Sequence, residues 1–261
     1  MANESQNDQP FAGWAIIQPS YKGNPRYFLV GSKAIFKQIR VEGGKMLFVE
    51  MLNELVCHSL GKRLGIPLVN TILGILPTQG LGLFSILLGE QPFNPNDANL
   101  KSEISNISKL KELFVFDQWI YNDDRRADHI MIGSEPTLPN IKVLYALDNG
   151  HTLNGYNGQK WTLETLNDDI LKAVGQVCFD SGISNYTELA NIISKIKSLK
   201  EDDIDKIIDD AVGVLEQFRL TAEELTQVKN NAEILKKMLK KRREYIEEII
   251  KTWCDKNGKP C

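Results

Sequence analysis

The part of the chain that most constrains its fold is the segment FVFDQWIYNDDRRADHIMIG, from Phe114 to Gly133. Acidic residues, two arginines and a histidine stand here between an apolar run with helical spacing and a short apolar run typical of a strand. Such a junction is expected near the core, where unpaired charges are costly. The segment is therefore either a solvated loop or a site that binds phosphate and metal.

The residues that follow the charged segment predict an antiparallel hairpin. The apolar runs IMIG, which ends at Gly133, and IKVLYALD, which begins at Ile141, flank a turn that contains prolines. If Gly133 pairs with Ile141, the pairing places Asp148 opposite Arg126, inside the charged segment itself.

This register would bring four side chains into one neighbourhood: Asp124, Asp128, His129 and Asp148. Crowded carboxylates repel one another unless a cation neutralises them. Oxygen ligands around an open site suit Mg²⁺, which usually keeps several waters and binds substrate phosphates. A magnesium and phosphate site is thus one hypothesis, and a loop whose side chains point into water is the other.

The first half of the chain predicts a small strand-rich unit that holds one long helix. Residues 13–44 contain short apolar runs separated by turn residues, which is typical of strands. Residues 45–65 have apolar side chains at helical spacing, and a Gly-Ile-Pro sequence ends this helix. Two more buried strands are expected in 68–78 and 82–89.

Lys37 is a candidate binding residue in this unit. It lies inside the apolar strand KAIFKQI, where an unpaired ammonium group would be costly. Glu54 on the following helix, or Glu50 one turn earlier, could pair with it.

The composition changes at the segment EQPFNPNDANL, whose two prolines and three asparagines are typical of a linker. Beyond the hairpin, nearly everything after Thr162 is expected to be helical. We predict a polar N-terminal tail (1–12), a small lobe (13–92), a larger helical lobe that contains the hairpin (93–254) and a C-terminal tail (255–261).

The overall composition excludes several classes of protein. A net charge of −3 leaves no basic excess that would suit nucleic acid or an anionic membrane. The four cysteines are far apart and lack CxxC spacing, which argues against a disulfide framework and a zinc site. The N-terminus lacks the apolar region of a signal peptide, and prolines and glycines interrupt the longest apolar stretch. We therefore expect a cytoplasmic protein that neither binds nucleic acid nor spans a membrane.

Four segments, taken in order, resemble HipA-like kinases, with phosphatidylinositol kinases as more distant relatives. AIIQPSYKGNPRYFLVGSKAIFKQI is similar to the family's opening, in which a turn with glycine precedes the strand of the ATP lysine. NELVCHSLGKRLGIPL resembles its E…LA..LG(L/I)P helix, and NDDRRADH…LDNG resembles its N-x-D-R-x-x-x-N…(I/L)-D-x-G signature. AEILKKMLKKRREYIEEII resembles the L..R...I helix that ends many such domains.

The resemblance runs from about residue 14 to 250. It implies an α+β, two-lobed, protein-kinase-like fold of the HipA-like type. The small N-lobe would be β-rich and bind nucleotide, and the larger C-lobe would be mostly helical.

The resemblance also implies roles for individual residues. Lys37 would contact the phosphates of ATP, with Glu54 as its ion-pair partner. Asp124 would be the catalytic base, and Asp148 would be a magnesium ligand. Two further nucleotide contacts are implied: Gly23 and Asn24 with nearby backbone N–H groups covering the phosphates, and GLFSILLGE as the hinge that reads adenine.

The sequence departs from the family pattern at one position. Five residues after Asp124, where the family has a metal-binding Asn, this chain has His129. Neutral imidazole is a poorer ligand for Mg²⁺ than an amide oxygen and favours softer metals such as Mn²⁺. Asp128 could take the place of the missing amide, or the site could bind nucleotide without catalysis.

The resemblance thus implies a kinase that uses ATP and Mg²⁺, or Mn²⁺, to phosphorylate a hydroxyl, with serine or threonine of a protein as the expected acceptor. Two alternatives stay open. The first is a pseudokinase or nucleotide-binding interaction module, which His129 favours. The second is a small-molecule or lipid kinase, in line with the distant likeness to phosphatidylinositol kinases.

Overall fold

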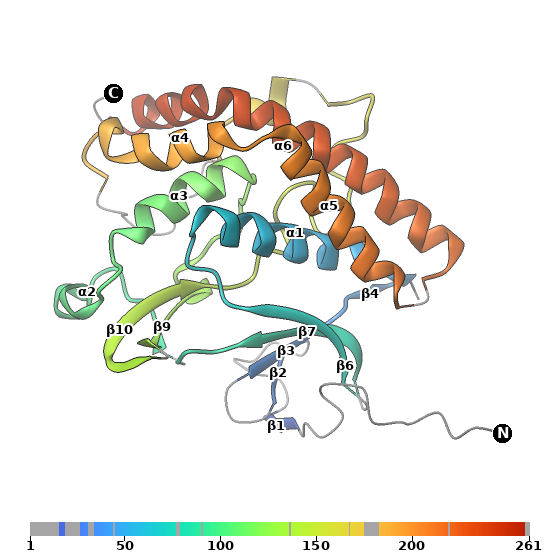
Figure 1. Ribbon diagram of the computed structural model, residues 1–261, viewed down its shortest axis with the longest axis horizontal. Coiled ribbons are helices and arrows are strands. Elements are labelled where there is room, and N and C mark those ends of the chain that lie inside the picture. The colour runs from blue at the N-terminus through green and yellow to red at the C-terminus, as the bar shows by residue number, and fades with distance from the viewer. Residues whose placement is uncertain are drawn as a thin grey trace.

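The structure is a computed structural model, and the described residues are 16–18, 27–30, 34–43, 45–76, 79–89, 91–135, 137–166, 168–174, 183–218 and 220–258. Figure 1 shows the larger helices on one side of the molecule and the sheets on the other. One connected hydrophobic core joins the two sides and includes Leu83, Phe116, Leu144 and Leu239.

The largest sheet is antiparallel and has five strands in the order β1-β2-β3-β7-β6. Its strands are Ile16–Gln18 (β1), Tyr27–Val30 (β2), Ala34–Gln38 (β3), Thr71–Leu76 (β6) and Gly80–Ile86 (β7). A two-stranded ribbon, Val41–Glu42 (β4) with Lys45–Met46 (β5), follows β3. The central strand β3 pairs with β2 and β7, so its side chains alternate between the two faces and Lys37 shares a face with Ile35.

The helix that follows the ribbon, Phe48–Leu64 (α1), lies between the large sheet and the other helices (Figure 1). It packs against the two long helices near the C-terminus, α5 and α6. It ends at Gly65, which has φ 73° and donates its N–H toward the last turn. The helix predicted over 45–65 is confirmed, and apolar residues on most of its sides suit its buried position.

The helical side consists mainly of Lys109–Trp119 (α3), Ala190–Ser198 (α4), Glu201–Glu216 (α5) and Ala222–Lys256 (α6). A short helix, Ala98–Glu103 (α2), and three 3₁₀ turns, Ala127–His129 (η2), Asp168–Leu171 (η3) and Tyr186–Leu189 (η4), complete the described helical elements. Thr221 and Glu224 form a capping box that starts α6. The apolar stripe of α6, with Leu235, Met238 and Leu239, faces the core.

The predicted hairpin exists, but its register differs from the expectation. It pairs Ile130–Glu135 (β9) with Leu138–Ala146 (β10), and Gln91–Pro92 (β8) adds a third strand. Gly133 lies opposite Val143, two residues beyond the predicted partner Ile141, because a bulge between Leu138 and Lys142 lengthens β10.

The predicted pairing of Asp148 with Arg126 is therefore wrong. Strand β10 ends at Ala146, and the N–H of Leu147 bonds to the carbonyl oxygen of His129 at 2.9 Å. A shift by two residues keeps every side chain on the same face of the sheet, so Asp148 still arrives beside the charged segment.

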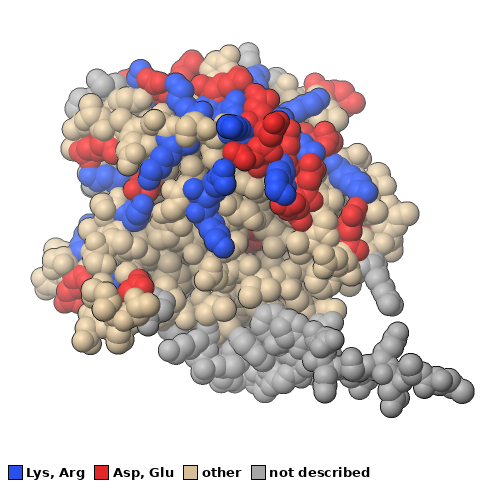
Figure 2. Space-filling view, in the orientation of Figure 1, with Lys and Arg blue, Asp and Glu red and all other residues tan. Residues whose placement is uncertain are grey.

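The described surface on the side shown in Figure 2 carries charges of both signs. Figure 2 shows lysine, arginine, aspartate and glutamate side chains gathered over the helices. Ion pairs join neighbouring helices, among them Lys240 with Asp205 at 2.7 Å and Arg63 with Asp203 at 3.1 Å. None of the described helices combines the length and the apolar composition needed to cross a membrane.

Candidate active site

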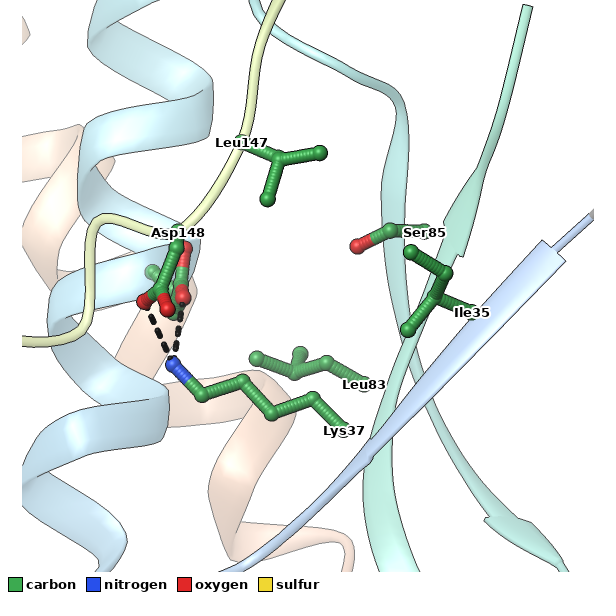
Figure 3. A pocket seen from close by; sticks show the side chains of 7 residues that line it. Ile35, Lys37, Leu83, Ser85, Leu147 and Asp148 are labelled. Carbon is green, nitrogen blue, oxygen red and sulfur yellow. Dashed lines mark hydrogen bonds and ion pairs between the residues drawn. The ribbon is translucent and has the colours of Figure 1, made fainter. Parts of the chain in front are cut away.

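Lys37 lies at the centre of the candidate site. Its side chain extends from β3 toward α1 and Asp148 (Figure 3) and is almost completely buried. Its Nζ lies 2.7 Å from Asp148 Oδ1, 2.8 Å from Glu50 Oε1 and 3.0 Å from Glu54 Oε1. One ammonium group is thus held by three carboxylates from two other parts of the chain.

Helix α1 presents a polar stripe to this site. Positions spaced i, i+3, i+4 and i+7 project from one side of a helix. The stripe consists of Glu50, Asn53, Glu54 and Cys57, all of them buried. The sequence left open which glutamate pairs with Lys37, and the structure places both against it.

The charges around Lys37 do not balance. Burial raises the pKa of Glu54, Lys37 lowers this pKa and Asp148 raises it again. The N–H of Asn149 also donates to Glu54 Oε2 at 2.9 Å, which stabilises the carboxylate. With Glu50 and Asp148 close by, the ionised site has an excess of negative charge that a bound cation would offset.

The loop that begins at Asp148 is held by α1. Asp148 has φ 61°, in the left-handed region that residues other than glycine seldom occupy. Asn53 Nδ2 lies 3.0 Å from the carbonyl oxygens of Gly150 and Thr152, and 3.1 Å from that of Gly155. The position of the Asp148 carboxylate therefore depends on contacts with α1 as well as on the hairpin.

Arg125 connects the charged segment to the same loop. Its buried guanidinium donates from Nε and Nη2 to the two carboxylate oxygens of Asp117, at 3.0 and 3.1 Å. It also donates from Nη1 to the carbonyl oxygen of Leu147 at 2.7 Å and from Nη2 to Asn149 Oδ1 at 2.8 Å. Arg125 thus fixes the residues on both sides of Asp148.

Asp124, the predicted base, lies beside this buried network but reaches the surface. Its N–H donates to Asn122 Oδ1 at 3.2 Å, and its side chain is 38% exposed. Arg126 Nη1 lies 3.7 Å from Asp124 Oδ1. The backbone of Asp124 is therefore held by Asn122, and its carboxylate remains accessible from solvent.

His129 is buried at the end of the charged segment. Burial lowers its pKa to about 4, Asp148 opposes this shift, and the two arginines of the segment add to it. Arg126 donates from Nη2 to His129 Nε2 at 2.7 Å, and Nδ1 has no hydrogen-bond partner among the described residues. Asp128 is exposed and accepts from Arg126 Nε at 3.1 Å. His129 is thus a neutral imidazole, and Asp128 is engaged by Arg126.

The predicted metal ligands come together only in part. The described residues contain no group of three or more His, Cys, Asp or Glu side chains placed to hold a metal ion. Mg²⁺ in nucleotide sites needs only one or two carboxylates besides the substrate phosphates. Asp148 fits this requirement, whereas His129 Nε2 would fit only after Arg126 releases it.

A pocket lies next to Lys37, between the large sheet and the residues that follow the hairpin (Figure 3). Its lining residues are Ile35, Lys37, Glu54, Leu83, Ser85, Leu147 and Asp148. Apolar walls with a few charged groups are typical of small-ligand sites. The cavity is small, about 10 Å³, which is room for about one water molecule. A flat ring could therefore enter between Ile35, Leu83 and Leu147 only after these walls move apart.

Much of the segment GLFSILLGE, which was predicted to be the hinge that reads adenine, is paired within the large sheet. Residues 82–85 pair with β3 and β6 on both sides, and Ile86 pairs with β3. The N–H of Gly89 donates to Tyr145 Oη at 3.1 Å, so few backbone groups of this segment are left for adenine. The carbonyl oxygen of Leu88 already accepts from the N–H of Ser134 at 3.2 Å. The other predicted nucleotide contacts, Gly23 and Asn24, lie outside the described residues.

Sequence reasoning missed Asn53, Arg125 and Asp117. Asn53 carries a usable signal, because it lies three positions after Glu50 and four before Cys57, and this spacing places polar residues along one side of the helix. The whole charged segment could be a solvated loop, so nothing in the sequence marked Arg125 as a buried residue. Asp117 lies within an apolar helix, where an unpaired carboxylate would be costly, so a buried cationic partner was foreseeable.

The comparisons with known proteins concern the fold. No protein-family model matches the sequence, and no curated protein matches it. The structure is similar to the crystal structure of the Helicobacter pylori proinflammatory kinase CtkA, with a TM-score of 0.58 and 14% identity over 95% of this chain and 98% of that one. It also matches a Shewanella oneidensis MR-1 HipA–HipB–operator DNA complex, with a TM-score of 0.45 and 12% identity over 85% of this chain and 61% of that one.

The similarity to CtkA confirms the kinase-like α+β fold that the resemblance to HipA-like kinases implied. At this level of identity the comparison concerns the fold and leaves the chemistry to be argued from the site.

Proposed function

We propose that the protein is a kinase that uses ATP and a divalent metal ion to phosphorylate a hydroxyl group, with serine or threonine of a protein as the acceptor. The observation that carries the proposal is the position of Lys37, which joins the strand β3, helix α1 and the post-hairpin Asp148 at one point. Phosphoryl transfer needs such a lysine for the phosphates, a separate metal ligand and an aspartate that orients the acceptor.

In the proposed reaction, Asp124 accepts a hydrogen bond from the acceptor hydroxyl. The hydroxyl oxygen forms a bond to the γ-phosphorus, the bond between that phosphorus and the β–γ bridging oxygen breaks, and ADP leaves. The hydroxyl proton passes to the Asp124 carboxylate. Its partial exposure suits this role, because the acceptor has to reach it from solvent.

Asp148 would hold the metal ion, with His129 as a second ligand once Arg126 has moved. The ion would neutralise charge on the phosphates, and it would offset the excess of carboxylates around Lys37. Binding of nucleotide would also draw Lys37 from the carboxylates toward phosphate oxygens. Arg125 keeps the Asp148 loop in place during this exchange, because its contacts lie on the residues before and after Asp148.

A second candidate function is nucleotide binding without catalysis. His129 favours it, since its Nε2 is engaged by Arg126 and a neutral imidazole suits Mg²⁺ poorly. The direct pair between Lys37 and Asp148 also favours it, because both groups would have to exchange partners before turnover.

The test is transfer of label from [γ-³²P]ATP, in autophosphorylation and to added protein, with Mg²⁺ and with Mn²⁺. Wild type is compared with Asp124→Asn and Asp148→Asn, each checked for folding by circular dichroism. Label that both substitutions abolish supports the kinase. Metal-dependent stabilisation by ATP without any label supports the nucleotide-binding module instead, and the absence of both refutes the proposal.

A further inference from the structure

Arg40 lies beside the Lys37 site but has no part in the proposed reaction. It follows the end of β3 by two positions, and its carbonyl oxygen accepts from the N–H of Leu47 at 2.8 Å. Arg40 Nε lies 3.7 Å from Glu50 Oε2, and the other carboxylate oxygen of Glu50, Oε1, lies 2.8 Å from Lys37 Nζ. The carboxylate of Glu50 thus lies between two cations, one next to each oxygen.

The guanidinium of Arg40 is held in position by the loop that follows Asp148. It lies 4.0 Å from the centre of the Tyr156 ring, and its Nη2 donates to His151 Nε2 at 3.2 Å. Its Nε is buried and makes no hydrogen bond with a described residue. The N–H of Arg40 that is nearest to Glu50 is therefore fixed close to the carboxylate and is available to it.

The carboxylate of Glu50 is enclosed by the same loop. Its side chain has no exposed surface, and the backbone of Gly150 packs against it. A Cβ atom added to Gly150 would lie 2.6 Å from Glu50 Cγ and 2.8 Å from Lys37 Nζ. Solvent therefore has no space to replace a cation that leaves Glu50, and a buried carboxylate that loses its cation is costly.

We infer that Arg40 is a positioning residue for nucleotide binding, which takes over the charge of Glu50 when Lys37 moves to the phosphates of ATP. This inference rests on the proposed function, in which Lys37 exchanges its carboxylates for phosphate oxygens. Arg40 Nε has to approach by roughly 1 Å, from 3.7 Å to the length of a charge-assisted hydrogen bond. Glu50 is then paired both before and after ATP binds, so Lys37 is released at a smaller cost.

The assignment gives each of the three carboxylates around Lys37 a group that stays with it. The N–H of Asn149 donates to Glu54 Oε2 at 2.9 Å, and this bond does not depend on Lys37. Asp148 would be held by the metal ion that arrives with ATP. Arg40 supplies the corresponding group for Glu50.

The experiment measures the Kd of ATP for the full chain by isothermal titration calorimetry, with Mg²⁺ and with Mn²⁺. Wild type, Arg40→Met, Glu50→Gln and the protein with both substitutions form a double-mutant cycle. Arg40→Lys is the conservative variant, because it keeps the positive charge. Circular dichroism checks each fold, and Arg40→Gln replaces Arg40→Met in the cycle if the latter is unfolded.

The matched control is Arg243→Met. Arg243 is another largely buried arginine, 13% exposed, and its contacts are with the carbonyl oxygen of Leu199 and with Glu201 at the start of α5. The control should lower Tm without changing the Kd of ATP, because it removes a guanidinium that has no contact with Glu50 or Lys37.

We expect Arg40→Met to weaken ATP binding by roughly 10-fold, because Glu50 then lacks the cation that would replace Lys37. In the Glu50→Gln background the same substitution should change the Kd by less than about 2-fold, since a neutral amide needs no counter-ion. Arg40→Lys should remain within about 3-fold of wild type, because the charge is kept.

Equal weakening by Arg40→Met with and without Glu50→Gln overturns the inference, because Arg40 would then act only through the structure of the loop. Arg40→Lys that binds ATP as weakly as Arg40→Met overturns it as well. ATP binding that Arg40→Met leaves unchanged overturns the inference while the proposed function stands. Wild type that binds no ATP with either metal refutes the proposed function and the role of Arg40 with it.

Discussion

Lys37 and Asp148 are 111 positions apart in the chain, yet Lys37 Nζ lies 2.7 Å from Asp148 Oδ1. The contact joins the central strand of the large sheet to the loop after the hairpin. It is possible because the pleat of β3 directs Lys37 toward α1 and the left-handed backbone at Asp148 turns its carboxylate back toward the strand. The groups proposed to bind phosphate and metal are thus already paired in the protein alone.

Lys37→Met is expected to destabilise the protein strongly, because three carboxylates would then share a buried space without the ammonium group. Breaking a buried ion pair costs about 3–5 kcal/mol. Adding Glu50→Gln should recover part of this free energy of unfolding, since it removes one of the repelling charges. Urea denaturation at neutral pH measures both effects.

The matched control for this prediction is Lys109→Met. Lys109 pairs with Glu112 at 2.6 Å, but both side chains are partly exposed, so the loss should be within about 1 kcal/mol. If the double variant is no more stable than Lys37→Met alone, the charge imbalance at the site is not what the lysine relieves.

Arg125 and Arg126, the neighbouring arginines of the charged segment, are expected to differ sharply in how much each contributes to the stability of the protein. Arg125→Lys should cost about 3 kcal/mol, because a lysine cannot make the two-point contact with Asp117 while also reaching Leu147 and Asn149. Arg126→Lys should change the free energy of unfolding by less than about 1 kcal/mol, since Arg126 is 54% exposed. Equal losses in the two variants, measured by urea denaturation, would contradict the bridging role of Arg125.

The sequence could predict those parts of the site that depend on residues close together in the chain. Helix α1 and Lys37 inside an apolar strand followed from periodicity, because those patterns depend on near neighbours. The hairpin was foreseeable, but its register was not, since Pro139 suits the turn as well as a bulge inside the strand, and the bulge lies directly after Leu138. The predicted register of the hairpin was wrong by two residues, and a shift by an even number leaves every side chain on the same face of the sheet. Asp148 therefore lies in the predicted neighbourhood although the strand pairing differs.

The tertiary contacts of the charged segment were beyond such reasoning. Arg125 and Arg126 are adjacent and chemically identical, yet one is buried against Asp117 and the other lies at the surface. Their burial differs because the side chain of Arg125 lies between Asp117 on α3 and Asn149 in the loop after the hairpin. In the same way, the three carbonyl oxygens around Asn53 come from a loop about 100 positions later in the chain, as the separations of 97 to 102 positions show.

His129→Asn is expected to change the metal preference of the reaction. Wild type should work better with Mn²⁺ than with Mg²⁺, and an amide oxygen at this position should favour Mg²⁺. The substitution also removes the contact of Arg126 Nη2 with the imidazole. Initial rates of label transfer at several concentrations of each metal test the prediction, and an unchanged ratio of the two rates would exclude His129 as a ligand.

The stability of wild type should fall as the pH decreases from about 6.5 toward 4. Burial lowers the pKa of His129 to about 4, so the unfolded chain takes up a proton first, and each further decrease of pH favours unfolding. The difference between the pKa of about 4 in the folded protein and the ordinary value of 6.5 corresponds to about 3 kcal/mol in the free energy of unfolding. His129→Asn should therefore show a flatter decline of the free energy of unfolding over this range, while His58→Asn, at a half-buried histidine whose pKa burial also lowers, should change it less. A decline of the same slope in wild type and His129→Asn would contradict the assignment.

Asn53→Leu is expected to loosen the loop that positions Asp148 while leaving the helices folded. The leucine leaves the carbonyl oxygens of Gly150, Thr152 and Gly155 without the amide donor, at a cost of about 1–3 kcal/mol. Hydrogen exchange should accelerate at the amide of Gly155, which bonds within this loop to the carbonyl oxygen of Thr152, and stay slow in α6. The charged variant Asn53→Asp should have the larger effect, because a carboxylate would repel the same oxygens. Since the loop carries Asp148, both variants should also weaken metal-dependent ATP binding, and exchange that accelerates everywhere alike would show that Asn53 supports the whole fold and not this loop.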